Sequence, residues 1–137
     1  MAPPGERAEK GGRILIVEDE PFIALTLEDM LAELGFTVAG TVAQVPEALA
    51  FLAAENPIDA ALLDVNIGSQ KIDPVADLLA ARACPFVFTT GYGRSGVPAA
   101  HNTHAVVQKP FRLEEIAAAL QSEMNNARAS GASDPLS

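Results

Sequence analysis

At 137 residues the chain is long enough for one domain with a buried core, and 49% of its residues are hydrophobic, as expected for a folded α/β protein. Its 18 acidic residues against 9 basic ones give a formal net charge of −9, which opposes binding to nucleic acid or to anionic membranes. The single cysteine, Cys84, excludes an intramolecular disulfide and is expected to be a small buried apolar residue. Since we find neither a membrane-spanning apolar run nor a signal peptide, we expect a cytoplasmic protein.

Strand and helix signals alternate along the chain between two expected flexible tails, residues 1–12 and 125–137. The domain itself is therefore expected over residues 13–124. Short apolar runs predict strands, and apolar residues at helical spacing predict helices. In chain order we expect a strand at 13–18, a helix from about Pro21 to Gly35, a strand at 36–39, a helix at 46–55, a strand at 58–63, a helix at 73–83, strands at 85–89 and 105–108, and a helix at 113–124.

This alternation predicts a doubly wound sheet of five parallel strands, joined by right-handed crossovers. The stretch 91–104 departs from it, because it holds three glycines, a proline and two histidines and has little helical periodicity. We expect a loop or one irregular turn there, in place of a fourth helix.

Polar side chains follow four of the predicted strands. They are Glu18 and Asp19 after the first strand, Asp64 after the third, Thr90 after the fourth and Lys109 after the fifth. Ligands of such sheets bind at the carboxyl ends of the strands, so these groups are expected to meet in one crevice. Three crowded carboxylates repel one another unless a cation is present, and an all-oxygen ligand set favours Mg²⁺.

Each of these residues has a simpler explanation when it is taken alone. Glu18 and Asp19 could cap the first helix, and Asp64 could be an ordinary turn residue. Their occurrence together, in this order, favours a site in which Asp64 attacks a phosphoryl group as the nucleophile. The metal and Lys109 would then neutralise the phosphoryl oxygens.

This pattern resembles the receiver domain of bacterial two-component response regulators over residues 13–124. The resemblance implies a flavodoxin-like fold with strand order 2-1-3-4-5, and it implies that Asp64 is the phosphoacceptor. It further implies that Mg²⁺ is bound by Glu18, Asp19, Asp64 and the backbone carbonyl of Asn66.

By the same resemblance, Thr90 is the switch hydroxyl and Lys109 the cationic contact of the phosphoryl group. Two positions depart from the usual pattern: Val106 stands where most receivers have an aromatic residue, and Gly68 where most have proline. The stretch 85–93 is similar instead to the Phe-Ala-Thr-Gly-aromatic motif of the stand-alone "FAT GUY" receivers, with Thr89 in place of the usual alanine. Tyr92 is then a candidate to carry the signal from the loop.

The function implied is that of a single-domain response regulator rather than a conventional enzyme, although it could catalyse its own phosphorylation and dephosphorylation. A histidine kinase or histidine phosphotransferase would phosphorylate Asp64 in a Mg²⁺-dependent reaction, and the signal would leave through a protein partner. A phosphate sink or shuttle in a phosphorelay is the alternative within this class. A haloacid-dehalogenase-like phosphotransferase is less favoured because its second aspartate is Asn66 here. A flavodoxin is disfavoured because acidic residues follow the first strand, where a phosphate loop would lie.

Overall fold

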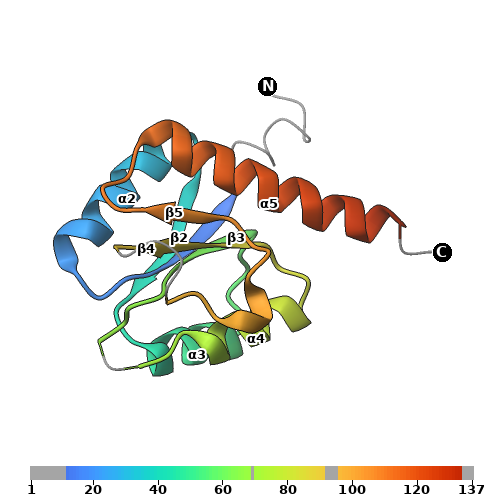
Figure 1. The fold of residues 1–137 in the computed structure, drawn as a ribbon, viewed down its shortest axis with the longest axis horizontal. Helices are drawn as coiled ribbons and strands as arrows, with labels where there is room; N and C mark the ends of the chain where they lie inside the picture. The colour runs from blue at the N-terminus through green and yellow to red at the C-terminus, as the bar shows by residue number, and fades with distance from the viewer. Residues whose placement is uncertain (1–11, 69, 92–95, 134–137) are drawn as a thin grey trace.

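The computed structural model describes residues 12–68, 70–91 and 96–133 (Figure 1). Five parallel strands form one sheet in the order β2-β1-β3-β4-β5, which confirms the predicted doubly wound, flavodoxin-like fold. The strands are β1 (Arg13–Val17), β2 (Thr37–Val42), β3 (Ala60–Asp64), β4 (Phe86–Thr90) and β5 (Val106–Gln108). The helical elements are α2 (Pro21–Glu33), α3 (Val45–Ala53), α4 (Asp73–Ala81), the 3-10 turn η1 (Ala99–His101) and α5 (Leu113–Ser133).

The three central strands explain why the sequence showed continuous apolar runs. All five residues of β3 and all five of β4 are buried, as are four of the five in β1. A parallel strand covered on both faces has no solvent side, so its sequence does not alternate between polar and apolar residues. Both β3 and β4 nevertheless end on polar residues, Asp64 and Thr90, which places these groups at the edge of the core.

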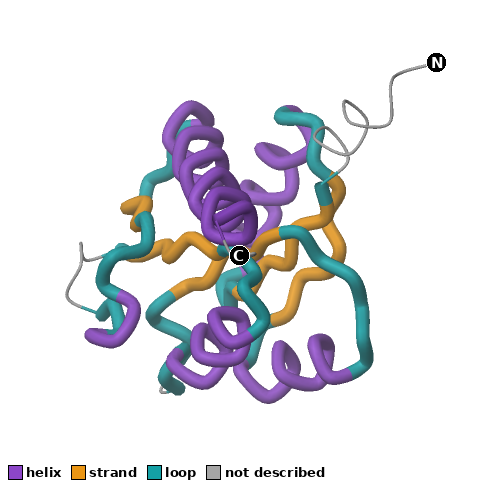
Figure 2. The backbone as a smooth tube through the Cα atoms, turned by 90° about the vertical axis from the view of Figure 1, so that its right-hand side faces the viewer, coloured by secondary structure: helices purple, strands orange, loops and turns teal. Residues whose placement is uncertain are grey.

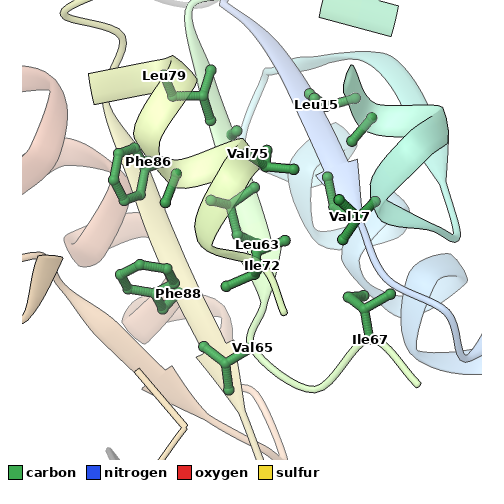
Figure 3. Close-up of a cluster of buried hydrophobic side chains, with 14 of the residues drawn as sticks. Leu15, Val17, Leu63, Val65, Ile67, Ile72, Val75, Leu79, Phe86 and Phe88 are labelled. Atoms are coloured by element: carbon green, nitrogen blue, oxygen red, sulfur yellow. The ribbon is translucent and has the colours of Figure 1, made fainter. Parts of the chain in front are cut away.

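Helices cover both faces of the sheet (Figure 2). We call the apolar cluster beneath α3 and α4 the α3–α4 core, and it includes Leu15, Leu63, Phe86 and Phe88 (Figure 3). The α2–α5 core on the opposite face includes Ile16, Leu62, Val87, Val107, Leu27 and Ile116. Neighbouring residues along a strand therefore pack in different cores, as the period of two requires.

The last helix is longer than the sequence predicted. α5 continues to Ser133, so residues 125–133, which were expected to belong to a flexible tail, are helical. No proline occurs between Pro110 and Pro135, and alanine, the strongest helix former, recurs through this stretch. The side chains of Gln121 and Asn125 also form a hydrogen bond of 3.0 Å across one turn. β2 likewise extends beyond its predicted end at residue 39, because Gly40, Thr41 and Val42 pair with β1.

The described residues of the connection between β4 and β5, 91 and 96–105, are largely non-helical, as predicted. Among its described residues the helical structure is the three-residue turn η1. Tyr92, the candidate for signalling from this loop, lies outside the described residues, as do residues 1–11 of the predicted N-terminal tail.

Cys84 packs against the α3–α4 core, and burial raises the pKa of its thiol to about 11. It is therefore the unreactive, largely buried residue that the sequence predicted. In the described part of the chain, none of the helices combines the length and apolar character that a membrane crossing requires.

Candidate functional site

Three carboxylates gather at the carboxyl ends of β1 and β3. Glu18 and Asp19 follow β1 directly, and Asp64 is the last residue of β3, which pairs with β1 in parallel register. One oxygen from each of the three side chains lies within 4.8 Å of the other two. Glu18 and Asp64 are buried, whereas Asp19 is accessible to solvent. The structure thus brings together the three acidic side chains that the sequence singled out.

Lys109 reaches this acidic cluster from β5, the edge strand. Its Nζ lies 3.4 Å from Asp64 Oδ2 and 3.3 Å from Glu18 Oε1. Burial alone would lower the pKa of the lysine, but the charges of Asp64 and Glu18 outweigh it and raise the pKa above its ordinary value. The ammonium therefore stays charged, and it offers one positive charge against the carboxylates.

Glu18 is a buried acid of the cluster with a raised pKa. Burial, followed by contact with and repulsion from Asp64, raises its pKa from 4.5 to about 7. Its Oε2 accepts a hydrogen bond of 3.1 Å from the amide of Glu20. Its Oε1 is buried and accepts no hydrogen bond from any described residue, because the nearby lysine meets it at an ion-pair distance only. A buried carboxylate oxygen without a hydrogen-bond donor is suited to bind a cation.

The two oxygens of Asp64 have different surroundings. Oδ1 accepts a hydrogen bond of 2.8 Å from the backbone amide of Asn66, and Oδ2 faces Lys109. The hydrogen bond from the amide of Asn66 fixes the rotation of the Asp64 carboxylate, and Asp64 is only 1% exposed. The predicted role of Asn66, a carbonyl ligand of the metal, stays a prediction, since the hydrogen bond involves its N–H.

Gly68 has a role that the sequence analysis missed. Its amide donates a hydrogen bond of 3.1 Å to Asp19 Oδ2, and its φ angle is +54°. Proline, the usual residue here by the family resemblance, has no N–H and a φ angle fixed near −65°. Proline could not make this contact, whereas glycine adopts the positive φ angle without strain, and the contact orients the exposed carboxylate of the cluster. The signal was visible as a departure from the pattern, but only the fold shows which residue it serves.

Thr90 lies at the end of β4 and is fully buried. Its carbonyl accepts a hydrogen bond of 2.7 Å from the amide of Lys109, which places these two predicted site residues side by side. The Lys109–Pro110 peptide bond is cis. Val106 pairs with Phe88 across the β4–β5 ladder and packs against the α3–α4 core, so the position that is usually aromatic is occupied by a small apolar side chain.

The donor set fits a hard divalent cation. All three side chains offer oxygen, one of them through a buried atom to which no described residue donates a hydrogen bond, and Mg²⁺ prefers oxygen ligands. Glu18, Asp19 and Asp64 would hold the ion. Lys109 lies close to two of these residues, Glu18 and Asp64.

This fold and this cluster of acids with a lysine define a receiver domain. The sequence model of the response regulator receiver domain matches residues 14–121, and the chain belongs to that family. Receiver domains are signalling domains that bind Mg²⁺ at an acidic pocket and take phosphoryl groups from donors such as histidine kinases.

Among curated proteins, the phyllosphere-induced regulator PhyR of Methylorubrum extorquens is 31% identical over 116 residues, which are 82% of this chain and 43% of PhyR. The transcriptional regulatory protein PdtaR of Mycobacterium tuberculosis is 29% identical over 113 residues, 80% of this chain and 55% of PdtaR. The chain thus spans about half the length of the curated relatives it matches.

A solved structure that is similar over nearly its whole length is that of SdrG from Sphingomonas melonis Fr1. It has a TM-score of 0.75 and 47% identity, and the match covers 84% of this chain and 98% of SdrG. The BeF3-activated conformation of SdrG, from a strain given as Pseudomonas melonis Fr1, matches with a TM-score of 0.70 and 49% identity over 82% of this chain and 95% of that one.

Proposed function

We propose that this protein is a single-domain response regulator, in which Asp64 accepts a phosphoryl group from a histidine kinase or histidine phosphotransferase. The observation that carries the proposal is that the ammonium of Lys109 lies 3.4 Å from Asp64 and 3.3 Å from a second buried carboxylate, Glu18. Lys109 contacts Oδ2 of Asp64, and the backbone amide of Asn66 donates a hydrogen bond to Oδ1. These two contacts hold the carboxylate in one orientation. The BeF3-activated form of the similar protein SdrG supports it, because beryllofluoride imitates a phosphoryl group.

In the proposed reaction, one oxygen of the Asp64 carboxylate attacks the phosphorus of the donor. The new O–P bond gives an acyl phosphate, while the bond between phosphorus and the donor breaks and its electron pair leaves with the donor. With phosphohistidine as donor, the leaving group is the imidazole nitrogen. The nucleophile is a carboxylate oxygen, so the transfer itself moves no proton from Asp64.

The lysine supplies positive charge where the phosphoryl oxygens would lie. The ammonium of Lys109 stays protonated because the two neighbouring carboxylates raise its pKa, so it remains a donor throughout the transfer. When bound, Mg²⁺ would neutralise further negative charge on the same oxygens. Glu18, Asp19, Asp64 and the carbonyl of Asn66 are the proposed ligands of the ion.

The signal would leave the site through Thr90 and β5. Thr90 joins the backbone of Lys109 by a 2.7 Å hydrogen bond, so movement of one end of β4 is transmitted to β5 directly. Val106 is too small to act as the usual rotating aromatic ring. We therefore place the response in the β4–β5 connection and its protein partner.

Intact mass after incubation with acetyl phosphate and Mg²⁺ tests the phosphoacceptor. We expect a mass increase of one phosphoryl group in the wild type and none in Asp64→Ala. Omission of Mg²⁺, with a chelator present, should lower the yield strongly. Asp73→Ala is the matched control, since this aspartate lies in the first turn of α4 and takes no part in the acidic cluster. Equal labelling of Asp64→Ala and the wild type would overturn the proposal.

A phosphate sink or shuttle uses the same chemistry and differs in where the phosphoryl group goes next. Single-turnover transfer from a phosphorylated kinase, followed by addition of a histidine phosphotransferase, distinguishes a shuttle from a response regulator. A response regulator retains the label until it hydrolyses, whereas a shuttle passes it on.

A further inference from the structure

Thr89 carries a buried hydroxyl that the site described above does not use. The residue is 1% exposed, and its Oγ1 has no hydrogen-bond partner among the described residues. A buried hydroxyl without a partner costs free energy, so proteins seldom keep one without a use. In the described part of the chain one other buried side-chain atom is in this condition, and it is Glu18 Oε1, within the acidic cluster.

Alternation along the strands places Thr89 on the same face of the sheet as Asp64. Phe88 packs in the α3–α4 core (Figure 3) and Val87 in the α2–α5 core, so Thr89 follows on the α2–α5 face. In β3, Leu63 packs in the α3–α4 core (Figure 3), and Asp64 therefore also lies on the α2–α5 face.

Thr89 is also the direct neighbour of Asp64 across the sheet. The two residues are paired in the β3–β4 register, and the amide of Val65 donates a hydrogen bond of 3.0 Å to the carbonyl of Thr89. Neighbouring strands lie about 4.8 Å apart, so the threonine side chain stands next to the aspartate on the same surface. Glu18 and Thr89 thus flank Asp64, one on each side.

Lys109 must pass over β4 to reach its carboxylates. Its amide bonds to the carbonyl of Thr90, so its backbone lies on the side of β4 that faces away from β3. Its Nζ is nevertheless 3.4 Å from Asp64 Oδ2, at the end of β3. The lysine side chain therefore crosses the end of β4, where Thr89 is the buried residue on the same face.

We propose that Thr89 is a positioning residue for Lys109. In the protein with Mg²⁺ bound, the ammonium would donate a hydrogen bond to the threonine hydroxyl, which accepts none from any described residue in the structure, and would thereby be held over Asp64 during phosphoryl transfer. An ammonium has three N–H donors. In the structure one is donated to Asp64 Oδ2 at 3.4 Å, and a second faces Glu18 Oε1 at an ion-pair distance of 3.3 Å. The hydroxyl supplies the acceptor for the third. This inference rests on the proposed function, because it assigns Thr89 to the same transfer step.

A pair of conservative substitutions tests the hydroxyl. Thr89→Val keeps the shape and removes the hydroxyl, whereas Thr89→Ser keeps the hydroxyl and removes a methyl group. We expect acetyl phosphate to label Thr89→Val roughly fivefold more slowly than the wild type, the equivalent of one ordinary hydrogen bond. Thr89→Ser should be labelled close to the wild-type rate. If Thr89→Val does not fold, Thr89→Ala against Thr89→Ser gives the same comparison.

The ¹⁵Nζ resonance of Lys109 gives a second readout that does not depend on phosphorylation. The chain has three lysines, Lys10, Lys71 and Lys109, so the resonance is assigned with Lys109→Arg. In the Mg²⁺-containing, unphosphorylated protein we expect this resonance to shift in Thr89→Val and to stay in place in Thr89→Ser. The resonance of Lys71 serves as the internal control.

The outcomes separate this inference from the proposed function. Slow labelling and a shifted Lys109 resonance in Thr89→Val, both restored in Thr89→Ser, support the inference. Unchanged labelling with an unchanged resonance overturns it, and so does slow labelling that serine fails to restore. If the wild type takes no phosphoryl group, the proposed function fails, and the Lys109 resonance alone decides whether Thr89 positions the lysine.

Discussion

Glu123 in α5 binds His104 in the connection before β5, with its Oε1 2.8 Å from Nδ1 of the histidine. Its other oxygen, Oε2, accepts a hydrogen bond of 2.6 Å from the amide of Ala105. The ring of His104 in turn stacks on Phe86 in β4, with ring centroids 4.0 Å apart. One buried carboxylate therefore links α5 to the amino ends of β5 and β4, opposite the strand ends that carry Thr90 and Lys109.

We predict that Glu123→Ala destabilises the protein by about 2 kcal/mol or more, because it leaves a backbone N–H and a histidine ring nitrogen without their acceptor. Glu123→Gln keeps one acceptor oxygen and should cost less. Chemical denaturation measures both free energies of unfolding. Glu33→Ala, at an exposed position of α2, is the control. A Glu123→Ala protein as stable as this control would show that the link carries no stability.

The raised pKa of Glu18 predicts that the metal-free protein loses stability as the pH rises. The carboxyl binds its proton more tightly in the folded state, with a pKa of about 7 against an ordinary 4.5. Its stabilising contribution is therefore complete below pH 4.5 and is lost as the pH rises through about 7. A shift of this size corresponds to on the order of 3 kcal/mol.

Thermal unfolding in chelator across this pH range measures the effect. Glu18→Gln, which cannot ionise, should flatten the dependence, and Glu28→Gln, on α2, is the control. If the slope is the same in Glu18→Gln and the wild type, another group is responsible.

The hydrogen bond from Gly68 to Asp19 predicts unequal effects of two substitutions on the binding of Mg²⁺. Gly68→Pro removes the N–H and cannot adopt the φ angle of +54°, so it should reduce the thermal stabilisation by Mg²⁺. Gly68→Ala keeps the N–H and has open space around the added carbon, so it should cost about 1 kcal/mol in stability and keep the response to Mg²⁺.

In the wild type, Mg²⁺ at 100 times its Kd should stabilise by about 2.7 kcal/mol. Asp19→Asn should lose most of that increment and leave the metal-free stability nearly unchanged. An undiminished response in both Gly68→Pro and Asp19→Asn would exclude Asp19 as a ligand.

Thr90 is predicted to affect the response to phosphorylation rather than the acceptance of the phosphoryl group. Thr90→Ala should still be labelled by acetyl phosphate, since the acceptor and Lys109 remain. Its amide resonances over residues 106–109 should move less on phosphorylation than those of the wild type. Thr103→Ala, at an exposed position outside the strands, is the control. Resonance changes of wild-type size in Thr90→Ala would remove the switch role.

The sequence was sufficient to predict the sheet and the residues of the acidic cluster. Continuous apolar runs identify the central strands, because β3 and β4 are buried on both faces, and the residues at their ends are then close in space. Helix ends were harder, since α5 passes the expected stop at Met124 without any proline to end it.

Contacts between distant segments could not be predicted from the pattern. Gly68 and Asp19 are 49 residues apart, and their hydrogen bond depends on how the loop after β3 folds back over β1. The same holds for the link from Glu123 to Ala105. The proposed role of the Thr89 hydroxyl, which lacks a partner among the described residues, can be inferred only when the path of the Lys109 side chain across β4 is known.

Reductive trapping of the phosphorylated protein tests the central claim most directly. Borohydride reduces an aspartyl phosphate to homoserine, and peptide sequencing by mass spectrometry then locates the modified residue. After treatment with acetyl phosphate and Mg²⁺, we predict homoserine at position 64 and an unmodified chain in Asp64→Ala. Homoserine at Asp19 or at another acidic position of the wild-type protein, with Asp64 intact, would contradict the account.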